Sequence, residues 1–500
     1  STPVIWSVAG TDSGGGAGLA ADQRAADAFG VHLCTVVAAV TAQSTTEVAH
    51  IEAMPPAVLQ AQLDTLAADL PPRVIKTGLL GSADNVRVLA RFVDRLRERG
   101  PLALVVDPVL RASTGAALAD AELRAAYREL LLPRATAITP NQGEAVALLE
   151  EAWPPRFPAP RGPLPPEGVP FILGRPGDES TDPAGVPALA AALRALGAQA
   201  VLVTGGDAAL VMPRASLSLD WMDTPQACGW LYLPREDTPH NHGTGCAFAS
   251  SLAAALAWGW CVADAAVLAK MAATHALRHA RAVGRGAGPV IAQPGFGADP
   301  TLLPHLSLSA ETPSAMAMPP RARAPGVYAI VDSPERVEAV LRATPTADTI
   351  QLRMKRPDGL TDSAWTERLQ TAIARGQHAA DAAGVLLVVN DHWRAALACG
   401  AKALHLGQED LQALSPEDLK ALDAARAQGV TLGLSSHSLW ELCRAAALAP
   451  DLIACGPLWP TTTKDMPWRP QGLDNLAWWA RMAPAPVAGI GGILEPAQLR

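Results

Sequence analysis

Short apolar segments alternate with helical segments along most of the chain, and this order limits the folds open to it. In the first half the apolar segments are residues 3–9, 31–43, 74–78, 102–108, 135–139 and 200–206. A glycine-rich turn and then a helical segment, 19–29, follow the first of them. Because strands that alternate with helices pair in parallel, this half is predicted to be an α/β fold with a doubly wound, mostly parallel sheet.

The same alternation returns after residue 326. Strands are expected at 327–332, 349–355, 385–391, 403–407, 431–437, 452–458 and 486–492, with helical segments between most of them. This order predicts a small TIM (β/α)8 barrel, whose ligands bind at the carboxyl ends of the strands. The last strand and helix of such a barrel are missing, because the sequence stops at Arg500. We expect the natural protein to continue, since an open barrel exposes sheet edges.

Residues 298–325, between the halves, are rich in Pro, Ala, Ser and Met and have no apolar period, which is typical of an interdomain linker. We therefore predict one domain at 1–297 and a second at 326–500. The Pro-rich residues 153–176 are interpreted as a surface excursion without secondary structure.

Composition and charge exclude several classes of protein. Apolar residues make up 49% of the chain and charged residues 18%, which indicates a globular rather than a disordered protein. The net charge is −8 without a basic stripe, which argues against nucleic acid as a partner. The seven cysteines are scattered and form no Cys-x-x-Cys pair, which favours a reduced cytosol over disulfides or zinc. The most apolar run, 247–260, is too short to span a bilayer, so we expect a cytoplasmic protein without a membrane partner.

A polar, glycine-rich turn leads into a helix of small residues expected at 247–258. Gly243 and Gly245 permit the turn, so the backbone N–H groups of Thr244, Gly245 and Cys246 would point out of the helix N-terminus. That position favours an anion, and a phosphoryl group in transfer is the natural occupant. In the first turn the pKa of the Cys246 thiol is expected to fall. A glycine-capped helix without a ligand is the alternative.

Polar residues also gather where the strands of the first half end. Residues 9–18 form a glycine-rich loop that is not a Walker A loop, because the Gly-Lys-Ser/Thr ending is missing. Asp12 and Asp22 would bind a small ligand there, or else be a turn carboxylate and a helix-surface carboxylate. Gln43 lies past a strand end, where its amide would pair with a heterocycle. The remaining strand-end residues are Lys76, Asp107, Asn141 and Glu144, of which the last two suit Mg²⁺-bound phosphate.

Six of these motifs, in this order, resemble hydroxymethylpyrimidine (phosphate) kinase of the ribokinase-like fold over residues 3–290. They are Ala9 to Gly18, Thr41 to Ser44, Lys76-Thr77-Gly78, Asp107-Pro108, Thr139-Pro140-Asn141 with Glu144, and His242-Gly243-Thr244-Gly245-Cys246. The resemblance implies that Gln43 and the backbone near Gly10 hold an aminopyrimidine, with Asp22 near its hydroxymethyl group.

The same resemblance implies an anion hole formed by Gly243 to Cys246. Cys246 would be the catalytic base or a donor to the transition state, and Lys76 is placed among the catalytic residues. Asn141, Glu144 and Asp107 would handle Mg²⁺ and the phosphates of ATP. One departure is Thr204, where the family usually has Lys, so this chain lacks that Lys contact to the nucleotide phosphates.

In the second half, polar residues end the predicted barrel strands. Gln351, Arg353 and Lys355 alternate, so they would share one face of the second strand. Asp391 and Asp410 come from adjacent strands, and their carboxylates would converge on one Mg²⁺. The alternative for either Asp alone is a cap or a surface charge. The other strand-end residues are Asn390, Ser435, Thr461, Thr463, Lys464 and Gly492.

The motifs Gln351 to Lys355, Val389 to Asp391, His405 to Asp410, Gly433 to His437, Gly456 to Lys464 and Gly489 to Gly492 resemble thiamine-phosphate synthase over residues 326–500. The resemblance implies that Asp391 and Asp410 bind Mg²⁺. It also implies that a pyrimidine diphosphate is surrounded by Gln351, Arg353, Lys355, Asn390, Ser435 and Lys464. Thr461, Thr463 and Gly492 would contact a thiazole phosphate.

Together the two resemblances predict a fused enzyme of thiamine biosynthesis with small-molecule substrates. The first half would phosphorylate hydroxymethylpyrimidine and its phosphate with ATP. The second half would couple the diphosphate to thiazole phosphate with Mg²⁺. The alternative is a pyridoxal or other vitamin kinase joined to a barrel that binds ligands without synthase activity. A homo-oligomer is expected from the family alone.

Overall fold

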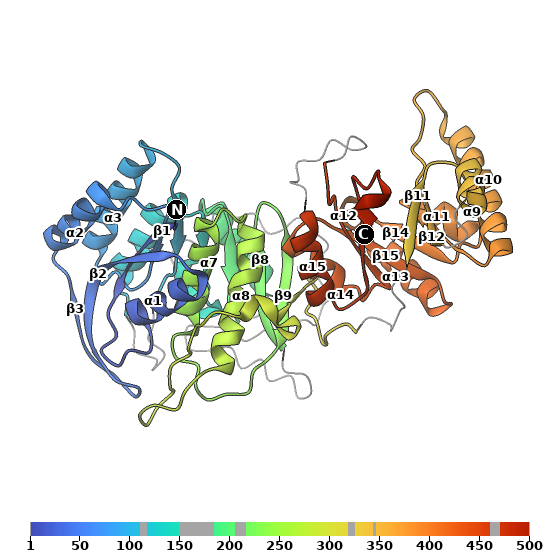
Figure 1. Cartoon of the computed structure of the whole chain (residues 1–500). Helices are drawn as coiled ribbons and strands as arrows, with labels where there is room; N and C mark the ends of the chain where they lie inside the picture. Colours follow the sequence, from blue (N-terminus) through green and yellow to red (C-terminus); the bar gives the residue numbers. More distant parts are fainter. Residues whose placement is uncertain are drawn as a thin grey trace, which may run out of the picture. The chain divides into compact units, whose positions relative to one another are not determined.

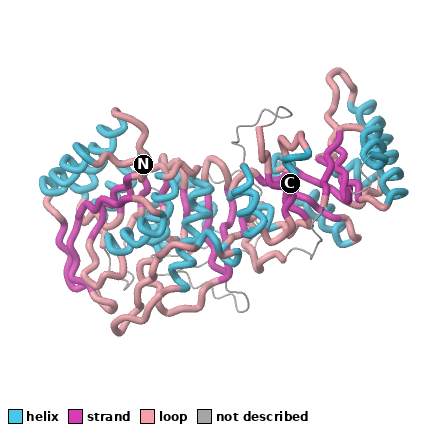
Figure 2. Tube along the Cα trace, in the orientation of Figure 1, coloured by secondary structure: helices cyan, strands magenta, loops and turns pink. Residues whose placement is uncertain are grey.

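The computed structural model describes residues 2–110, 118–149, 185–205, 217–318, 326–343, 347–460 and 471–499. They form two compact units, which divide between Met316 and Ala317 (Figure 1). In each unit, strands form a central sheet and helices lie beside it (Figure 2).

The first unit is built on a ten-stranded sheet in the order β10-β9-β8-β7-β6-β5-β4-β1-β2-β3. The parallel strands are β1 (Val4–Gly10), β2 (His32–Gln43), β4 (Val74–Thr77), β5 (Ala103–Val106), β6 (Ala137–Ile138) and β7 (Val201–Val203). Each lies in one of the predicted apolar segments, so the doubly wound, mostly parallel sheet is confirmed. The antiparallel strands were not predicted; they are β3 (Val48–Ala53), β8 (Leu217–Asp223), β9 (Cys228–Pro234) and β10 (His305–Leu306).

The helices of this unit lie beside the sheet (Figure 2). They are α1 (Gly18–Phe29), α2 (Pro56–Asp69), α3 (Ala83–Arg97), α4 (Ala121–Ala126), α5 (Gln142–Leu149), α6 (Val186–Ala195), α7 (Thr244–Ala257) and α8 (Val262–Arg278), with short π or 3-10 turns at Tyr127–Leu131, Leu132–Arg134, Phe296–Ala298 and Pro300–Leu302. The central helix is α7, which packs on α1, α8, β1, β4 and β5. Its alanines, such as Ala249 and Ala253, are fully buried, so small side chains let it lie close to the sheet.

The second unit has seven parallel strands, each paired with the next in sequence order. They are β11 (Val327–Val331), β12 (Ala347–Leu352), β13 (Leu386–Asn390), β14 (Ala403–Leu406), β15 (Thr431–Ser436), β16 (Leu452–Cys455) and β17 (Val487–Gly489). The helices are α9 (Pro334–Ala343), α10 (Asp362–Ala383), α11 (Trp393–Ala398), α12 (Gln408–Gln412), α13 (Pro416–Ala427), α14 (Leu439–Ala447) and α15 (Gly472–Met482), with a 3-10 turn at Pro496–Leu499. This is the strand order of a TIM barrel through its seventh strand, as predicted.

The linker was predicted at residues 298–325, but its first part is packed on the first unit. Strand β10 pairs with β9, and the indole N–H of Trp230 donates to the carbonyl of Ala310 at 3.0 Å. Leu302 and Leu306 are fully buried. Their irregular spacing among prolines gives no period, so the sequence did not reveal this packing. The predicted excursion at 153–176 lies outside the described residues.

Within the described ranges, no helix combines the length and the apolar character needed to cross a membrane.

Candidate active sites

Lys76 of β4 is 1% exposed and lies among acidic and hydroxyl groups from four other segments. Its Nζ donates to Asp22 Oδ1 at 2.9 Å and lies 3.7 Å from Asp107 Oδ2. Asp22 also accepts from the hydroxyls of Ser7 at 2.6 Å and Ser250 at 2.7 Å. Asp22 is therefore a fully buried carboxylate, not the helix-surface group of the alternative interpretation. Buried charges are costly unless they are paired and hydrogen-bonded, and this cluster meets that requirement.

The same burial changes the acidity of the neighbouring groups. Burial raises the pKa of Asp107 to about 6, aided by Asp22 and opposed by Lys76. Burial also raises the pKa of Cys246 to about 12; Lys76 opposes this, and the carboxylates of Asp22 and Asp107 add to it. The prediction that the thiol pKa falls is wrong, because burial and two carboxylates outweigh the helix terminus and Lys76. At neutral pH the side chain of Cys246 is a thiol that can donate a hydrogen bond.

Helix α7 begins at Thr244, three residues before the predicted start. Gly243 has φ +87°, and an added Cβ would lie 2.3 Å from the carbonyl oxygen of Gly16, so only glycine fits. The N–H of Thr244 donates to the carbonyl of Asn241 at 3.2 Å. The prediction that this N–H points at an anion is therefore wrong. The N–H groups of Gly245 and Cys246 precede the first intrahelical bond, in the turn where an anion is favoured.

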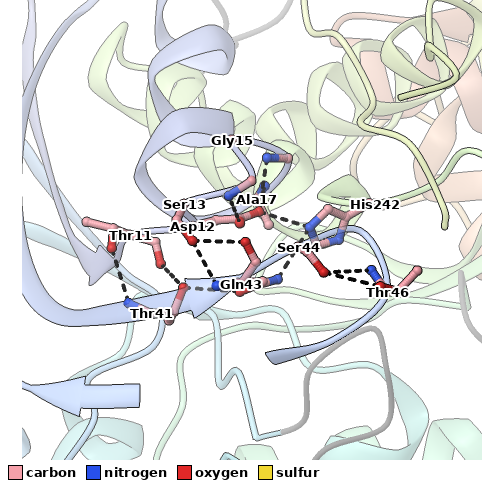
Figure 3. Close-up of polar contacts among 12 residues, drawn as sticks. Thr11, Asp12, Ser13, Gly15, Ala17, Thr41, Gln43, Ser44, Thr46 and His242 are labelled. Carbon is pink, nitrogen blue, oxygen red and sulfur yellow. Dashed lines mark hydrogen bonds and ion pairs between the residues drawn. The ribbon is translucent and has the colours of Figure 1, made fainter. Parts of the chain in front are cut away.

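The loop after β1 is tied to the segment before α7 by Asp12 and His242 (Figure 3). Asp12 accepts the backbone N–H groups of Gly14 at 2.8 Å, Gly16 at 2.9 Å and Ala17 at 2.8 Å, and its Oδ2 lies 3.0 Å from His242 Nε2. Burial opposes ionisation, but the bonds from His242 and the backbone lower the pKa of Asp12. Asp12 is thus the turn carboxylate of the alternative interpretation.

Gln43 joins this cluster from the end of β2 (Figure 3). Its Nε2 lies 3.5 Å from His242 Nε2, and its backbone N–H donates to the hydroxyl of Ser13 at 2.8 Å. Gly10, the last residue of β1, packs on Leu79, 3.1 Å from where a Cβ would be. Our sequence interpretation did not single out His242, because its partners lie about 200 residues away and only the fold joins them.

Asn141 and Glu144 form a reciprocal cap where α5 begins, at the carboxyl end of β6. The N–H of Asn141 donates to Glu144 Oε2 at 3.0 Å, and the N–H of Glu144 donates to Asn141 Oδ1 at 2.8 Å. Glu144 Oε1 also accepts the N–H of Leu110 at 3.2 Å. Thr204 pairs with Asn141 in a parallel bridge, so the ends of β6 and β7 lie together. These oxygens are of the type that Mg²⁺-bound phosphate prefers.

In the second unit, Asp391 and Asp410 converge at the ends of β13 and β14. Burial, and then the neighbouring carboxylate of Asp410, raise the pKa of Asp391 to about 6. Asp391 has φ +66°, a conformation uncommon for a residue with a Cβ, and its N–H donates to His405 O at 3.0 Å. A divalent cation would relieve the repulsion between the two carboxylates, so the pair fits Mg²⁺. Among the described residues, no group of three or more His, Cys, Asp or Glu side chains is arranged to hold a metal ion.

The other predicted residues of this unit are only partly brought together. Gln351 is buried and donates to the Tyr328 hydroxyl at 3.1 Å. The second strand was predicted to reach residue 355, but β12 ends at Leu352. The N–H of Arg353 still donates to Val331 O of β11 at 2.8 Å, and Lys355 lies beyond the strand.

Asn390 is buried at the last position of β13, and Ser435 Oγ lies 2.8 Å from His405 Nε2. Gly492 has φ +74°, and an added Cβ would lie 2.6 Å from Trp459 O. Thr461, Thr463 and Lys464 lie outside the described residues.

Two family models match the chain, one on each unit. Phosphomethylpyrimidine kinase matches residues 12–155 and 173–291, and thiamine monophosphate synthase matches residues 327–498. Among solved structures, pyridoxal kinase from Staphylococcus aureus in complex with pyridoxal aligns with a TM-score of 0.46 at 24% identity, over 58% of this chain and 93% of its own.

Curated relatives are similar over one unit or over both. The hydroxymethylpyrimidine/phosphomethylpyrimidine kinase of Synechococcus elongatus is 37% identical over 58% of this chain and 96% of its own length. The chloroplastic thiamine biosynthetic bifunctional enzyme of Arabidopsis thaliana is 32% identical over 98% of this chain and 85% of its own length. The probable chloroplastic counterpart of Oryza sativa is 31% identical over 98% of this chain and 81% of its own. The chain therefore belongs to the thiamine biosynthetic bifunctional enzymes, with a kinase unit followed by a thiamine monophosphate synthase unit.

Proposed function

We propose that the first unit transfers the γ-phosphoryl group of ATP to hydroxymethylpyrimidine and then to its monophosphate. The second unit couples the resulting diphosphate to thiazole phosphate, releasing diphosphate and thiamine phosphate. The observation that carries this proposal is the presence, on one chain, of a buried Lys76 cluster beside a helix N-terminus and of a paired-carboxylate site at a barrel rim. The product of the first site is the substrate of the second.

In the kinase unit, the N–H groups of Gly245 and Cys246 and the ammonium of Lys76 stabilise the charge on the phosphoryl group in transfer. Cys246 acts as a thiol donor, since its raised pKa makes it a poor base at neutral pH. Gly243 allows this turn, and Thr244 starts the helix. Gln43 and the Gly10 backbone bind the pyrimidine, with the buried Asp22 near its hydroxymethyl group as the partner of Lys76. Asp107, Asn141 and Glu144 bind the Mg²⁺-bound phosphates of ATP.

In the synthase unit, Asp391 and Asp410 would hold Mg²⁺, which neutralises charge on the leaving diphosphate. The bond between the methylene carbon and the diphosphate oxygen breaks, and a bond from that carbon to the thiazole nitrogen forms. The aminopyrimidine stabilises positive charge on the methylene, so electrostatic help to the leaving group is the main contribution. The diphosphate is surrounded by Gln351, Arg353, Lys355, Asn390, Ser435 and Lys464, and the thiazole phosphate by Thr461, Thr463 and Gly492.

The test follows both products in one reaction. The purified chain is incubated with hydroxymethylpyrimidine, ATP, Mg²⁺ and thiazole phosphate, and pyrimidine diphosphate and thiamine phosphate are quantified over time. Formation of both is expected. A parallel reaction with supplied pyrimidine diphosphate and no ATP measures the synthase alone.

Each failure has a distinct meaning. Accumulation of the diphosphate without thiamine phosphate would contradict the synthase assignment, and absence of the diphosphate would contradict the kinase assignment. Competition by pyridoxal, with preferential pyridoxal phosphorylation, would favour the alternative vitamin kinase. The cytoplasmic location and the homo-oligomer stay predictions.

A further inference from the structure

A second buried cation lies outside the reaction centre, on α8. Lys270 is 3% exposed. Its Nζ donates to Ser218 O at 3.1 Å, to Ser218 Oγ at 2.7 Å and to Asp220 Oδ2 at 2.8 Å. An ammonium group has three donors, and each has an acceptor here. Lys270 therefore holds the carboxylate of Asp220 in one position on β8.

The other oxygen of Asp220 faces the carboxyl end of β7. Asp220 Oδ1 accepts the N–H of Gly205 at 2.9 Å. Gly205 lies so close to β8 that an added Cβ would be 2.1 Å from Leu219 O. The preceding residue, Thr204, donates its N–H to Pro140 O at 2.9 Å and bridges to Asn141. The segment Thr204–Gly205, just past the end of β7, is thus bound to β8 on one side and to the segment that carries Asn141 on the other.

We propose that Asp220, held by Lys270, is a positioning residue for the nucleotide site of the kinase unit. It fixes the segment Thr204–Gly205 beside Asn141, and the inference rests on the proposed function, in which Asn141 helps to hold the phosphates of ATP. Thr204 has no cationic side chain, and the N–H groups of Thr204 and Gly205 are already bonded to Pro140 and Asp220. This segment can therefore offer the phosphates only the Thr204 hydroxyl, beside Asn141. A hydrogen bond from that hydroxyl depends on direction, so a displaced segment would lose it.

Two double variants separate positioning from charge. Lys270→Met with Asp220→Leu removes the ion pair and the acceptor for Gly205. Lys270→Met with Asp220→Asn removes the same charges but keeps an amide oxygen for Gly205. Replacing both members of a buried pair avoids leaving one charge unpaired. The full chain is used, and binding of a non-hydrolysable ATP analogue with Mg²⁺ is measured by calorimetry.

We expect the Leu variant to raise the Kd of the analogue on the order of tenfold, which is about 1.4 kcal/mol. The Asn variant should stay within about threefold of the wild type, and the KM for the pyrimidine should change in neither. Equal Kd values for the wild type and a folded Leu variant would overturn the inference. If the Leu variant does not fold, Lys270→Met alone, which leaves Asp220 without its clamp, is judged by the same rise in Kd.

A matched control lies on the same strand. Arg194 pairs with Asp223 at 2.6 Å, and Asp223 is opposite Val201, at the other end of β7 from Gly205. Arg194→Met should leave the Kd unchanged, and an equal loss there would mean that any damage to β8 weakens binding. Failure of the wild type itself to bind the analogue would instead refute the kinase function, so the two failures are distinguishable.

Discussion

Replacing Lys76 with methionine removes the cation that neutralises two buried carboxylates. Asp22 lies 2.9 Å and Asp107 3.7 Å from the ammonium, and all three side chains are at most 7% exposed. Breaking a buried pair by removing one partner costs about 3–5 kcal/mol. A domain has only about 5–15 kcal/mol of stability, so Lys76→Met should leave the first unit marginally stable and its kinase inactive.

A second substitution separates the structural role from the chemical one. In Lys76→Met with Asp22→Asn, the amide still reaches the hydroxyls of Ser7 and Ser250, and one buried charge fewer remains. Most of the lost stability should return. Kinase activity should stay at least about a hundredfold below the wild type, because the phosphoryl group still lacks the ammonium.

The assay compares three readouts on the full chain: kinase turnover, synthase turnover with supplied pyrimidine diphosphate, and thermal unfolding. Synthase turnover should stay within about twofold of the wild type in both variants, because its site lies in the other unit. Recovery of kinase activity together with stability in the double variant would refute the catalytic role of Lys76. Lys76 would then serve only to neutralise Asp22.

Three further changes test other parts of the structure. In Gly243→Ala the new Cβ would lie 2.3 Å from Gly16 O, which should shift the start of α7 and lower the kinase kcat at least about tenfold. The control is Gly259→Ala, which also has a positive φ, +94°, but has no atom within 4 Å of the added Cβ. It should leave the kinase kcat unchanged. Asp391→Asn should abolish thiamine phosphate formation from supplied diphosphate even in excess Mg²⁺, with kinase turnover intact; a synthase that survives would contradict the metal assignment. Burial lowers the pKa of His305 from 6.5 to about 4, so the folded state keeps the imidazole neutral while the unfolded state protonates it below pH 6.5. The folding free energy that depends on the neutral imidazole is therefore fully present above pH 6.5 and is lost as the pH falls through 4. His305→Phe should therefore flatten denaturant stability between pH 7 and 4 by up to about 3 kcal/mol, and an unchanged pH dependence would show that other groups dominate.

The features of the fold and of the candidate sites that depend on local residue spacing could be predicted from the sequence. The parallel strands, the ends where Lys76 and Gln43 lie, and the pair Asp391 and Asp410 follow from strand spacing and from the rule that ligands bind at carboxyl ends. The sequence was insufficient where the outcome depends on distant neighbours. The helix-terminus rule predicted an acidic thiol at Cys246, but carboxylates from two other segments and burial reverse the sign.

Strand edges and loops were missed for a related physical reason. β10 consists of His305 and Leu306 alone, and it is a strand only because β9 offers a free edge. Arg353 and Lys355 continue an alternating pattern in the sequence, but β12 ends at Leu352 and the N–H of Arg353 makes one further bond to β11. Such endings depend on which backbone partner is present, and no residue spacing carries that information.

The contact between Asp12 and His242 also constrains how the protein is made. The chain emerges from the ribosome N-terminus first, yet the loop that follows the first strand is completed only by a residue 230 positions later. A contact between residues so far apart in sequence belongs to the slow, non-local part of folding. A nascent chain that stops short of His242 therefore lacks the residue that ties this loop to the start of α7.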